Sequence, residues 1–183
     1  MCLVYVFLAD GFEEVEGLTT VDLLRRAGAD VRMVSIMGKK QITGSHGIAL
    51  EADMLFEDEL AQADLYVLPG GMPGTNYLRE HAGLAALLKE QYAAGTGLAA
   101  ICAAPSVFAG LGFLKGRVCT SYPGCLEGYE TGKVVEDPVA VDGHVTTSRG
   151  VGTAIPFALS LIGQLYGQER ADEIAASIVF NRS

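Results

Sequence analysis

The stretch Leu98-Ala99-Ala100-Ile101-Cys102-Ala103-Ala104-Pro105-Ser106 decides the fold of this chain. Its small and apolar residues predict a fully buried strand. Ala104-Pro105 predicts the start of a helix, because proline fits the first helical turn, where no backbone N–H is needed. Cys102 therefore falls on a strand-to-helix turn, at the carboxyl edge of a sheet and beside the positive end of the next helix. Both features are expected to favour a thiolate over a thiol.

Apolar strands and helical segments alternate along the rest of the chain. Strands are expected at residues 3–8, 30–36, 63–68, 98–102 and 117–121, helices at 13–27, 83–94, 154–166 and 169–179, and hairpins at 39–51 and 138–148. The first hairpin is expected to cap or extend an edge of the sheet. This order predicts an α/β fold with a doubly wound, mostly parallel sheet sandwiched between helices. No linker or internal repeat interrupts it, so residues 1–183 are expected to form one domain.

The composition indicates a globular protein without affinity for nucleic acid. Hydrophobic residues make up 50% of the 183 residues and charged residues 19%, and the net charge of −9 repels phosphate backbones. No apolar stretch reaches the ~20 residues that a membrane-spanning helix needs. Residues 1–8 have no basic leader or cleavage site and are interpreted as a strand, so we expect a cytoplasmic protein without a membrane partner.

The cysteines and histidines do not predict a metal centre. The chain has four cysteines, Cys2, Cys102, Cys119 and Cys125. No two of them are separated by two residues, as in a zinc knuckle or a redox dithiol, so free thiols are expected. His81 and His144 are interpreted as surface or turn residues, and no metal-ligand spacing joins them. We predict neither a metal nor a cofactor.

Three loops are expected to meet where parallel strands end. They are residues 10–16 after the first strand, Pro69-Gly70-Gly71 after the central strand, and Cys102-Ala103-Ala104. They would bring together a carboxylate, unobstructed backbone amides and a thiol, which acyl transfer and carbonyl addition require. Two alternatives stay open at this point: Cys102 as a small buried filler, and Glu16 as a charge that complements a helix dipole.

Four motifs resemble those of the ThiJ/PfpI superfamily. They are Gly11-Phe12-Glu13-Glu14-Val15-Glu16, Val67-Leu68-Pro69-Gly70-Gly71, Ala100-Ile101-Cys102-Ala103-Ala104-Pro105 and Thr147-Ser148-Arg149-Gly150-Val151-Gly152-Thr153. Within the superfamily, the chain is similar to the branch of the parkinsonism-associated protein deglycase (DJ-one). The resemblance implies a flavodoxin-like α/β sandwich, a homodimer and a reactive cysteine on a strained nucleophile elbow.

The resemblance also implies a role for several residues. Cys102 would be the nucleophile, Glu16 its partner carboxyl, and the backbone at Gly70, Gly71 and Ala103 the oxyanion pocket. An ionised Glu16 in contact with Cys102 would raise the thiol pKa and oppose thiolate formation. We therefore expect Glu16 to hold a proton, so that the pair shares one proton and titrates as a unit.

The chain departs from the superfamily at two positions near the expected site. Tyr122 stands where several relatives carry a histidine, and His46 lies near the place of an arginine that reaches the other subunit in some relatives. A Tyr of ordinary pKa ~10 is a poor base at neutral pH, although it can donate a hydrogen bond. Tyr122, His46 and Arg149, which lies within the fourth motif, are expected to support the site. Peptide hydrolysis is disfavoured, because Ala103 and not a histidine follows Cys102.

The expected function is that of a cofactor-free cysteine enzyme acting on small dicarbonyls or glycated adducts, of the glutathione-independent glyoxalase or deglycase type. Cys102 would form a hemithioacetal, and Glu16 would carry the proton. The alternative is an oxidative-stress sensor or chaperone-like protein, in which Cys102 is oxidised to a sulfinic acid and little turnover occurs.

Overall fold

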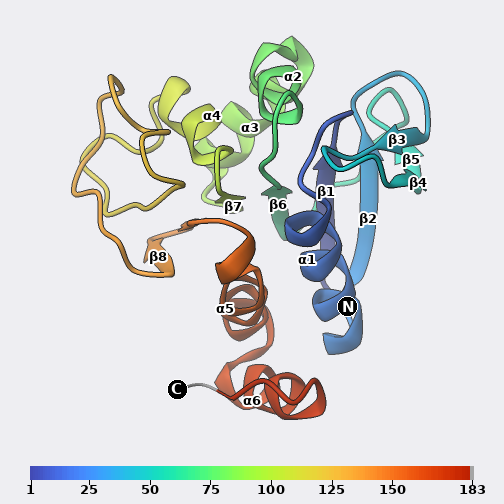
Figure 1. Cartoon of the computed structure of the whole chain (residues 1–183), viewed down its shortest axis with the longest axis vertical. Coiled ribbons are helices and arrows are strands. Elements are labelled where there is room, and N and C mark those ends of the chain that lie inside the picture. The colour runs from blue at the N-terminus through green and yellow to red at the C-terminus, as the bar shows by residue number, and fades with distance from the viewer. Residues whose placement is uncertain (182–183) are drawn as a thin grey trace.

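A computed structural model describes residues 1–181, and its centre is a seven-stranded sheet (Figure 1). The strands are β1 (Leu3–Leu8), β2 (Asp30–Ser35), β5 (Met54–Leu55), β6 (Leu65–Leu68), β7 (Gly97–Ile101), β8 (Val139–Asp142) and β9 (Val145–Ser148). They lie in the order β5-β2-β1-β6-β7-β9-β8, and only β8 runs antiparallel to its neighbour. The prediction of a mostly parallel sheet is therefore confirmed.

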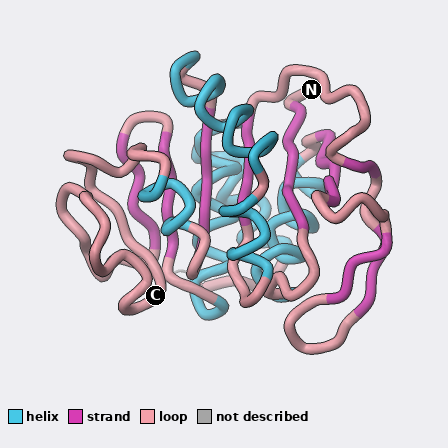
Figure 2. The backbone as a smooth tube through the Cα atoms, turned by 90° about the horizontal axis from the view of Figure 1, so that it is seen from above, coloured by secondary structure: helices cyan, strands magenta, loops and turns pink. Residues whose placement is uncertain are grey.

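Helices cover both faces of this sheet, as the view in Figure 2 shows. They are α1 (Glu14–Ala27), α2 (Gly74–Glu80), α3 (Ala82–Ala94), α4 (Pro105–Gly110), α5 (Ala154–Tyr166) and α6 (Gln168–Ser177), with a single 3₁₀ turn, η1 (Val151–Thr153), before α5. Apolar residues of α1, α5 and α6 form one core layer, and those of α2, α3 and α4 form the other. Strand β1 contributes side chains to both core layers, because Val4 and Val6 pack in the first layer and Tyr5 and Phe7 pack in the second.

The order of the strands determines where a site can form. From β1, the chain first adds β2 and β5 on one side and then β6, β7 and β9 on the other. Connections therefore leave the carboxyl ends of β1 and β6 in opposite directions and open a crevice between them. The loops after β1, β6 and β7 border this crevice.

The expected strand at residues 117–121 is absent, and of the two roles expected for the hairpin at 39–51, capping or extending the sheet, extension is excluded. Residues 117–121 form no strand and make only an isolated bridge between Cys119 and Val134. Side chains replace the ladder there, because Val118 N donates to Asp142 Oδ2 and Thr120 N donates to Thr147 Oγ1. The hairpin of β3 (Gln41–Thr43) and β4 (Ala49–Glu51) does not extend the main sheet but forms a separate two-stranded sheet.

The structure also contains elements that the pattern did not predict. Helix α2 follows the glycine-rich loop directly, and the two-residue strand β5 pairs with the end of β2. His81, expected on the surface or in a turn, caps α3, because its Nδ1 accepts a hydrogen bond from Leu84 N at 2.9 Å. The last helix ends at Ser177, two residues before the predicted end. No helix within residues 1–181 is long and apolar enough to cross a membrane.

Candidate active site

Cys102 occupies a strained turn between β7 and α4. Its φ of 65° lies in the left-handed region, which residues with a Cβ rarely adopt. Two backbone hydrogen bonds hold it there, from Cys102 N to Ser148 O at 3.0 Å and from Tyr122 N to Cys102 O at 2.8 Å. The strand-to-helix turn expected from the sequence is therefore present, and neighbouring segments fix its conformation.

Glu16 reaches the same place from the first turn of α1. The residue is fully buried, and its Oε2 accepts a hydrogen bond from Gly70 N at 2.9 Å. The other carboxyl oxygen, Oε1, is buried and has no hydrogen bond of regular geometry among the described residues. The Glu16 carboxyl interacts with the Cys102 thiol, so the structure brings the two predicted partners together.

Two backbone amides, those of Gly71 and Ala103, donate toward the Cys102 thiol. Gly71 adopts a φ of 90°, which glycine tolerates without strain. A Cβ at Gly70 would lie 2.6 Å from Cys102 Cβ and 2.7 Å from Glu16 Oε2, so only glycine fits between the two side chains. The predicted oxyanion pocket thus has two donors aimed at the thiol, and Gly70 leaves the space that lets the thiol and carboxyl meet.

Burial controls the protonation of this pair. It raises the pKa of Glu16 to about 7, although the hydrogen bonds from Cys102 and Gly70 act in the opposite direction. Burial and the charge and hydrogen bond of Glu16 raise the pKa of Cys102 to about 12. Both groups are therefore harder to ionise than in water, and the charge of Glu16 opposes ionisation of the Cys102 thiol.

The backbone donors at the turn favour a thiolate, as expected, but other groups outweigh them. The two amide donors lower the thiol pKa, but burial and Glu16 outweigh them. Helix α4 has only six residues, and the dipole effect of a helix end is worth little against a buried carboxylate. A thiolate at Cys102 thus requires that the proton of the pair sits on Glu16.

An open cavity of about 480 Å³ gives access to the thiol. It is lined by Glu13, Glu16, Gly71, Cys102, Tyr122, Pro123 and the segment 149–153. Tyr122 is 55% exposed and Arg149 is half-buried. The structure therefore gathers all the predicted site residues except His46 around the pair of Cys102 and Glu16, with Gly70 and Ala103 in contact with the pair but not among the cavity lining.

Gly150 is a site residue that the sequence argument did not single out, although it belongs to the fourth motif. A Cβ at this position would lie 3.6 Å from Tyr122 Cδ2, 3.8 Å from Glu16 Oε1 and 4.0 Å from Cys102 Sγ. Its φ of 162° is ordinary extended backbone, so the conformation does not require glycine. The missing side chain keeps the space over the thiol open, which only the fold could reveal.

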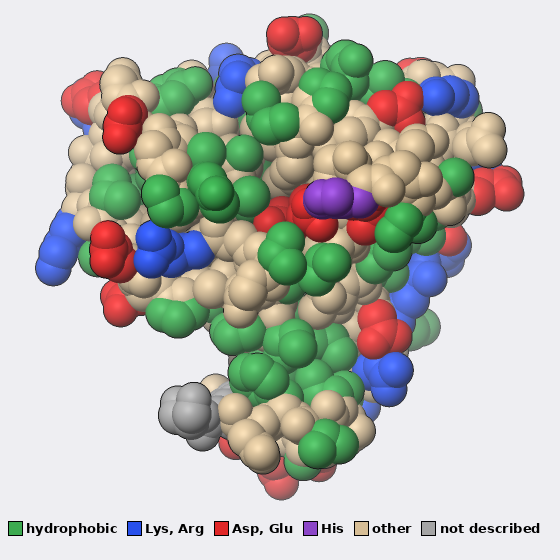
Figure 3. All heavy atoms as spheres, in the orientation of Figure 1, with side chains coloured by type: hydrophobic (Ala, Val, Ile, Leu, Met, Phe, Trp, Pro, Cys, Tyr) green, Lys and Arg blue, Asp and Glu red, His purple; other side chains and the backbone are tan. Residues whose placement is uncertain are grey.

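His46 lies on the hairpin turn and pairs with acidic residues instead of the thiol. On the face shown in Figure 3, a histidine stands among acidic side chains. His46 Nδ1 is 3.1 Å from Glu14 Oε2 and 3.4 Å from Glu13 Oε2, and the hydrogen bond with Glu14 raises the pKa of His46. His46 Nδ1 and one carboxylate oxygen each of Glu13 and Glu14 are atoms of the kind that bind metal ions, and they lie within 4.8 Å of one another. Ser45 Oγ forms hydrogen bonds with all three of these residues. We interpret this group as an ion-pair cluster that fastens the hairpin to α1.

Replacing Glu14 is expected to lower the free energy of unfolding of the protein by an amount that depends on pH. Glu14 is 3% exposed, and burial alone would raise its pKa; hydrogen bonds from its own N–H, His46 and Ile48 lower it to about 2. The carboxylate then contributes stability above its unfolded pKa of 4.5, and this contribution is lost as the pH falls toward 2. Glu14→Gln should lower the free energy of unfolding at pH 7 by about 1–3 kcal/mol. Urea titrations at pH 7 and pH 3 check this, and an equal loss at both values would contradict it.

The fold and the site together define an α/β protein with a cysteine on a strained strand-to-helix turn and a neighbouring carboxyl. Residues 3–164 match the DJ-1/PfpI family. The chain therefore belongs to the DJ-1/PfpI family, as the four motifs predicted.

Relatives and solved structures agree with this assignment. The Arabidopsis thaliana protein DJ-1 homolog A is 39% identical over 96% of this chain, which spans only 46% of that relative. A Caenorhabditis elegans protein, glutathione-independent glyoxalase DJR-1.2, is 32% identical and covers 88% of this chain and 87% of its own length. The structure of oxidized Toxoplasma gondii DJ-1 superimposes with a TM-score of 0.94 at 37% identity, and covers 100% of both chains. The flavodoxin-like fold is thereby confirmed.

Proposed function

We propose that this protein is a cofactor-free cysteine enzyme of the glyoxalase or deglycase type that acts on small 2-oxoaldehydes or their early adducts. The observation that carries the proposal is the pairing of the partly exposed Cys102 thiol with the buried Glu16 carboxyl, both of which line an open cavity. A carboxyl with a pKa of about 7 can both donate and accept a proton at neutral pH. The name of the Caenorhabditis elegans relative, a glutathione-independent glyoxalase, supports the same chemistry.

The first step is addition of the thiol to the aldehyde of methylglyoxal. The thiol sulfur forms a bond to the aldehyde carbon, its proton passes to Glu16, and the carbonyl oxygen then takes a proton from Glu16. The developing oxyanion lies near the N–H groups of Gly71 and Ala103, which donate toward the thiol in the free protein. The product of this step is a hemithioacetal on Cys102.

The second step moves a proton between neighbouring carbons. Glu16 as carboxylate takes the proton from the former aldehyde carbon and returns it to the adjacent carbon through an enediol, while the hydroxyl proton of the hemithioacetal passes to the former ketone oxygen. The first carbon is oxidised and the second is reduced, so no external oxidant or cofactor is needed. Water then hydrolyses the resulting thioester and releases lactate and the free thiol.

Lactate formation from methylglyoxal tests the proposal. The parent protein is expected to release lactate, and Cys102→Ser should reduce the rate at least about 100-fold, because the nucleophile is lost. Cys125→Ser, which removes a half-buried thiol outside the cavity, is the matched control and should keep the parent rate. No lactate from the parent, or equal rates in the parent and Cys102→Ser, would overturn the proposal.

A second candidate is a redox sensor at the same thiol. The structure of the Toxoplasma gondii relative is of an oxidized form, and the N–H groups of Gly71 and Ala103 are placed to bind sulfinate oxygens. Two molecules of peroxide would convert the thiol to the sulfinic acid and two of water. A selective gain of two oxygens at Cys102 under mild peroxide, with no lactate from methylglyoxal, would favour this candidate over the enzyme.

A further inference from the structure

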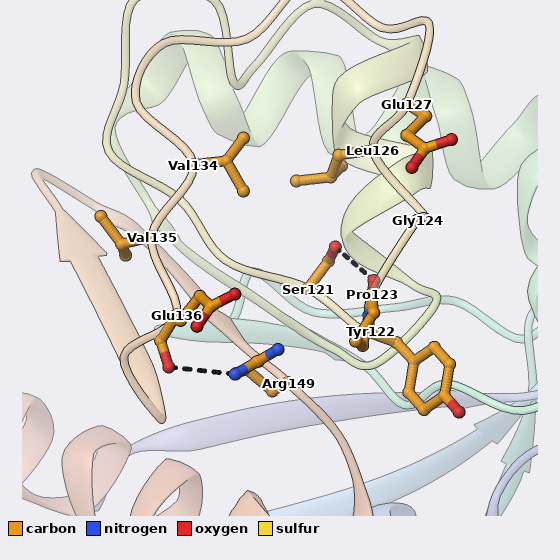
Figure 4. A pocket seen from close by; sticks show the side chains of 10 residues that line it. All are labelled: Ser121, Tyr122, Pro123, Gly124, Leu126, Glu127, Val134, Val135, Glu136 and Arg149. Carbon is orange, nitrogen blue, oxygen red and sulfur yellow. Dashed lines mark hydrogen bonds between the residues drawn. The ribbon is translucent and has the colours of Figure 1, made fainter.

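A second cavity adjoins the one above Cys102. It has a volume of about 440 Å³ and lies between residues 121–127 and 134–136. Figure 4 shows Leu126 and Val134 on one side of it, with Glu136 and the guanidinium of Arg149 opposite. The two cavities share Tyr122, Pro123 and Arg149 as lining residues. Since the Tyr122 ring points away from the second cavity (Figure 4), this residue and Pro123 form a wall that both cavities share.

Arg149 stands at the border of the two cavities without a carboxylate partner among the described residues. Its Nη1 donates to the backbone oxygen of Glu136 at 3.2 Å. Arg79 also has no carboxylate partner, but its guanidinium bonds to Asn76 Oδ1 and Ser106 Oγ. Five arginines place a nitrogen 2.6–3.0 Å from a carboxylate oxygen: Arg25, Arg26, Arg32, Arg117 and Arg170. Arg149 is thus the one described arginine that bonds to no protein side chain.

The charges around Arg149 indicate which anion it suits. A guanidinium presents parallel N–H donors that match a carboxylate or a phosphate group. Glu127 and Glu136 line the second cavity and Glu13 and Glu16 line the first, so an anion there meets carboxylates on both sides. The protein as a whole carries a charge of −9. A phosphate dianion would meet about twice the repulsion of a carboxylate and about twice the attraction to Arg149. Because the carboxylates that line the two cavities outnumber Arg149, the balance favours the single charge of a carboxylate.

We propose that the preferred substrates of Cys102 are 2-oxoaldehydes that carry a carboxylate, which Arg149 binds while the aldehyde reacts with the thiol. The proposal rests on the proposed function. It assigns Arg149 to substrate recognition, and it assigns the second cavity, with its apolar Leu126, Val134 and Val135, to longer substituents. The overall reaction stays balanced, because one 2-oxoaldehyde and one water give one 2-hydroxy acid.

The test compares a charged substrate with its uncharged analogue. The probes are 4,5-dioxopentanoate, whose product is 2-hydroxyglutarate, and its neutral methyl ester. The parent is expected to prefer the acid by about tenfold in kcat/KM, the gain of one charged hydrogen-bonded pair. Arg149→Gln should reduce this preference to about one. Arg149→Lys, which keeps the positive charge but lacks the parallel N–H donors of a guanidinium, should give an intermediate value.

Arg32→Gln is the matched control, since it removes the same charge from a residue at the other end of the sheet that pairs with Asp30. It should keep the tenfold preference. No preference in the parent, or an unchanged preference in Arg149→Gln, overturns the proposal. Hydroxypyruvaldehyde phosphate is the third probe, and a preference for it over the carboxylate would overturn the choice of carboxylate.

A binding measurement separates failure of this proposal from failure of the proposed function. The acid and the ester are each used to protect Cys102 from alkylation by iodoacetamide, which requires no turnover. If the parent turns over neither these compounds nor methylglyoxal, the enzyme proposal fails. Protection by the acid at about tenfold lower concentration than by the ester, abolished in Arg149→Gln, would still support an anion-binding role for Arg149. Equal protection by both compounds would contradict it.

Discussion

Glu16→Gln is expected to lose at least about 100-fold in the turnover of methylglyoxal while Cys102 is still alkylated by iodoacetamide at pH 8. Positioned acid–base groups contribute about 10²–10⁴ to rates, and the amide cannot carry a proton between the two substrate carbons. The thiol should react at least as fast as in the parent, because the Glu16 charge that raises its pKa is gone. The two rates, measured side by side, separate loss of the proton carrier from loss of the nucleophile.

Glu14→Gln is the matched control for this experiment. Glu14 is also a buried carboxyl near the start of α1, but it bonds to the hairpin turn instead of the thiol. Its variant should keep turnover per folded molecule. Equal turnover in Glu16→Gln and the parent would show that another group moves the proton, and slow alkylation in Glu16→Gln would show that the carboxyl activates the thiol.

Glu16→Gln is also expected to be more stable than the parent at pH 8.5, with a free energy of unfolding higher by about 2–3 kcal/mol. Glu16 has a folded pKa of about 7 against 4.5 for the exposed group, so the folded state holds this proton more tightly than the unfolded state. The stability linked to that proton is fully present below pH 4.5 and is lost as the pH rises through 7. Above pH 7 the folded protein contains a buried carboxylate, whose cost a glutamine of similar shape avoids.

Urea titrations at pH 5 and pH 8.5 measure this difference. At pH 8.5 the gain corresponds to a rise in melting temperature of about 5–10 °C for a domain of this size, and at pH 5 the two proteins should be nearly equal. A variant that is less stable than the parent at pH 8.5 would contradict the raised pKa. Stability gained on removing a functional group is the usual sign that a site is maintained for activity.

Much of the fold follows from local patterns in the sequence. Strand β1 and helix α1 lie within one residue of their predicted limits, because burial periodicity and capping residues are properties of neighbouring positions. Helix α2 was missed, since its seven residues begin in a glycine-rich loop and have no side-chain cap. Residues 117–121 were predicted as a strand from their composition, but distant side chains from Asp142 and Thr147 take their amides.

The sequence by itself determined the parallel α/β order, the turn at Cys102 and the convergence of the loops that carry Glu16, Gly71 and Cys102, because these depend on local pattern and on the rule that parallel strands end at one edge. Only the tertiary structure decided that the pKa values of both Glu16 and Cys102 are raised, how the space above the thiol is shaped and which described arginine bonds to no protein side chain. Those properties depend on burial and on contacts between residues far apart in the chain. The turn at Cys102 is therefore local in origin, while its thiol pKa of about 12 comes from burial and from Glu16.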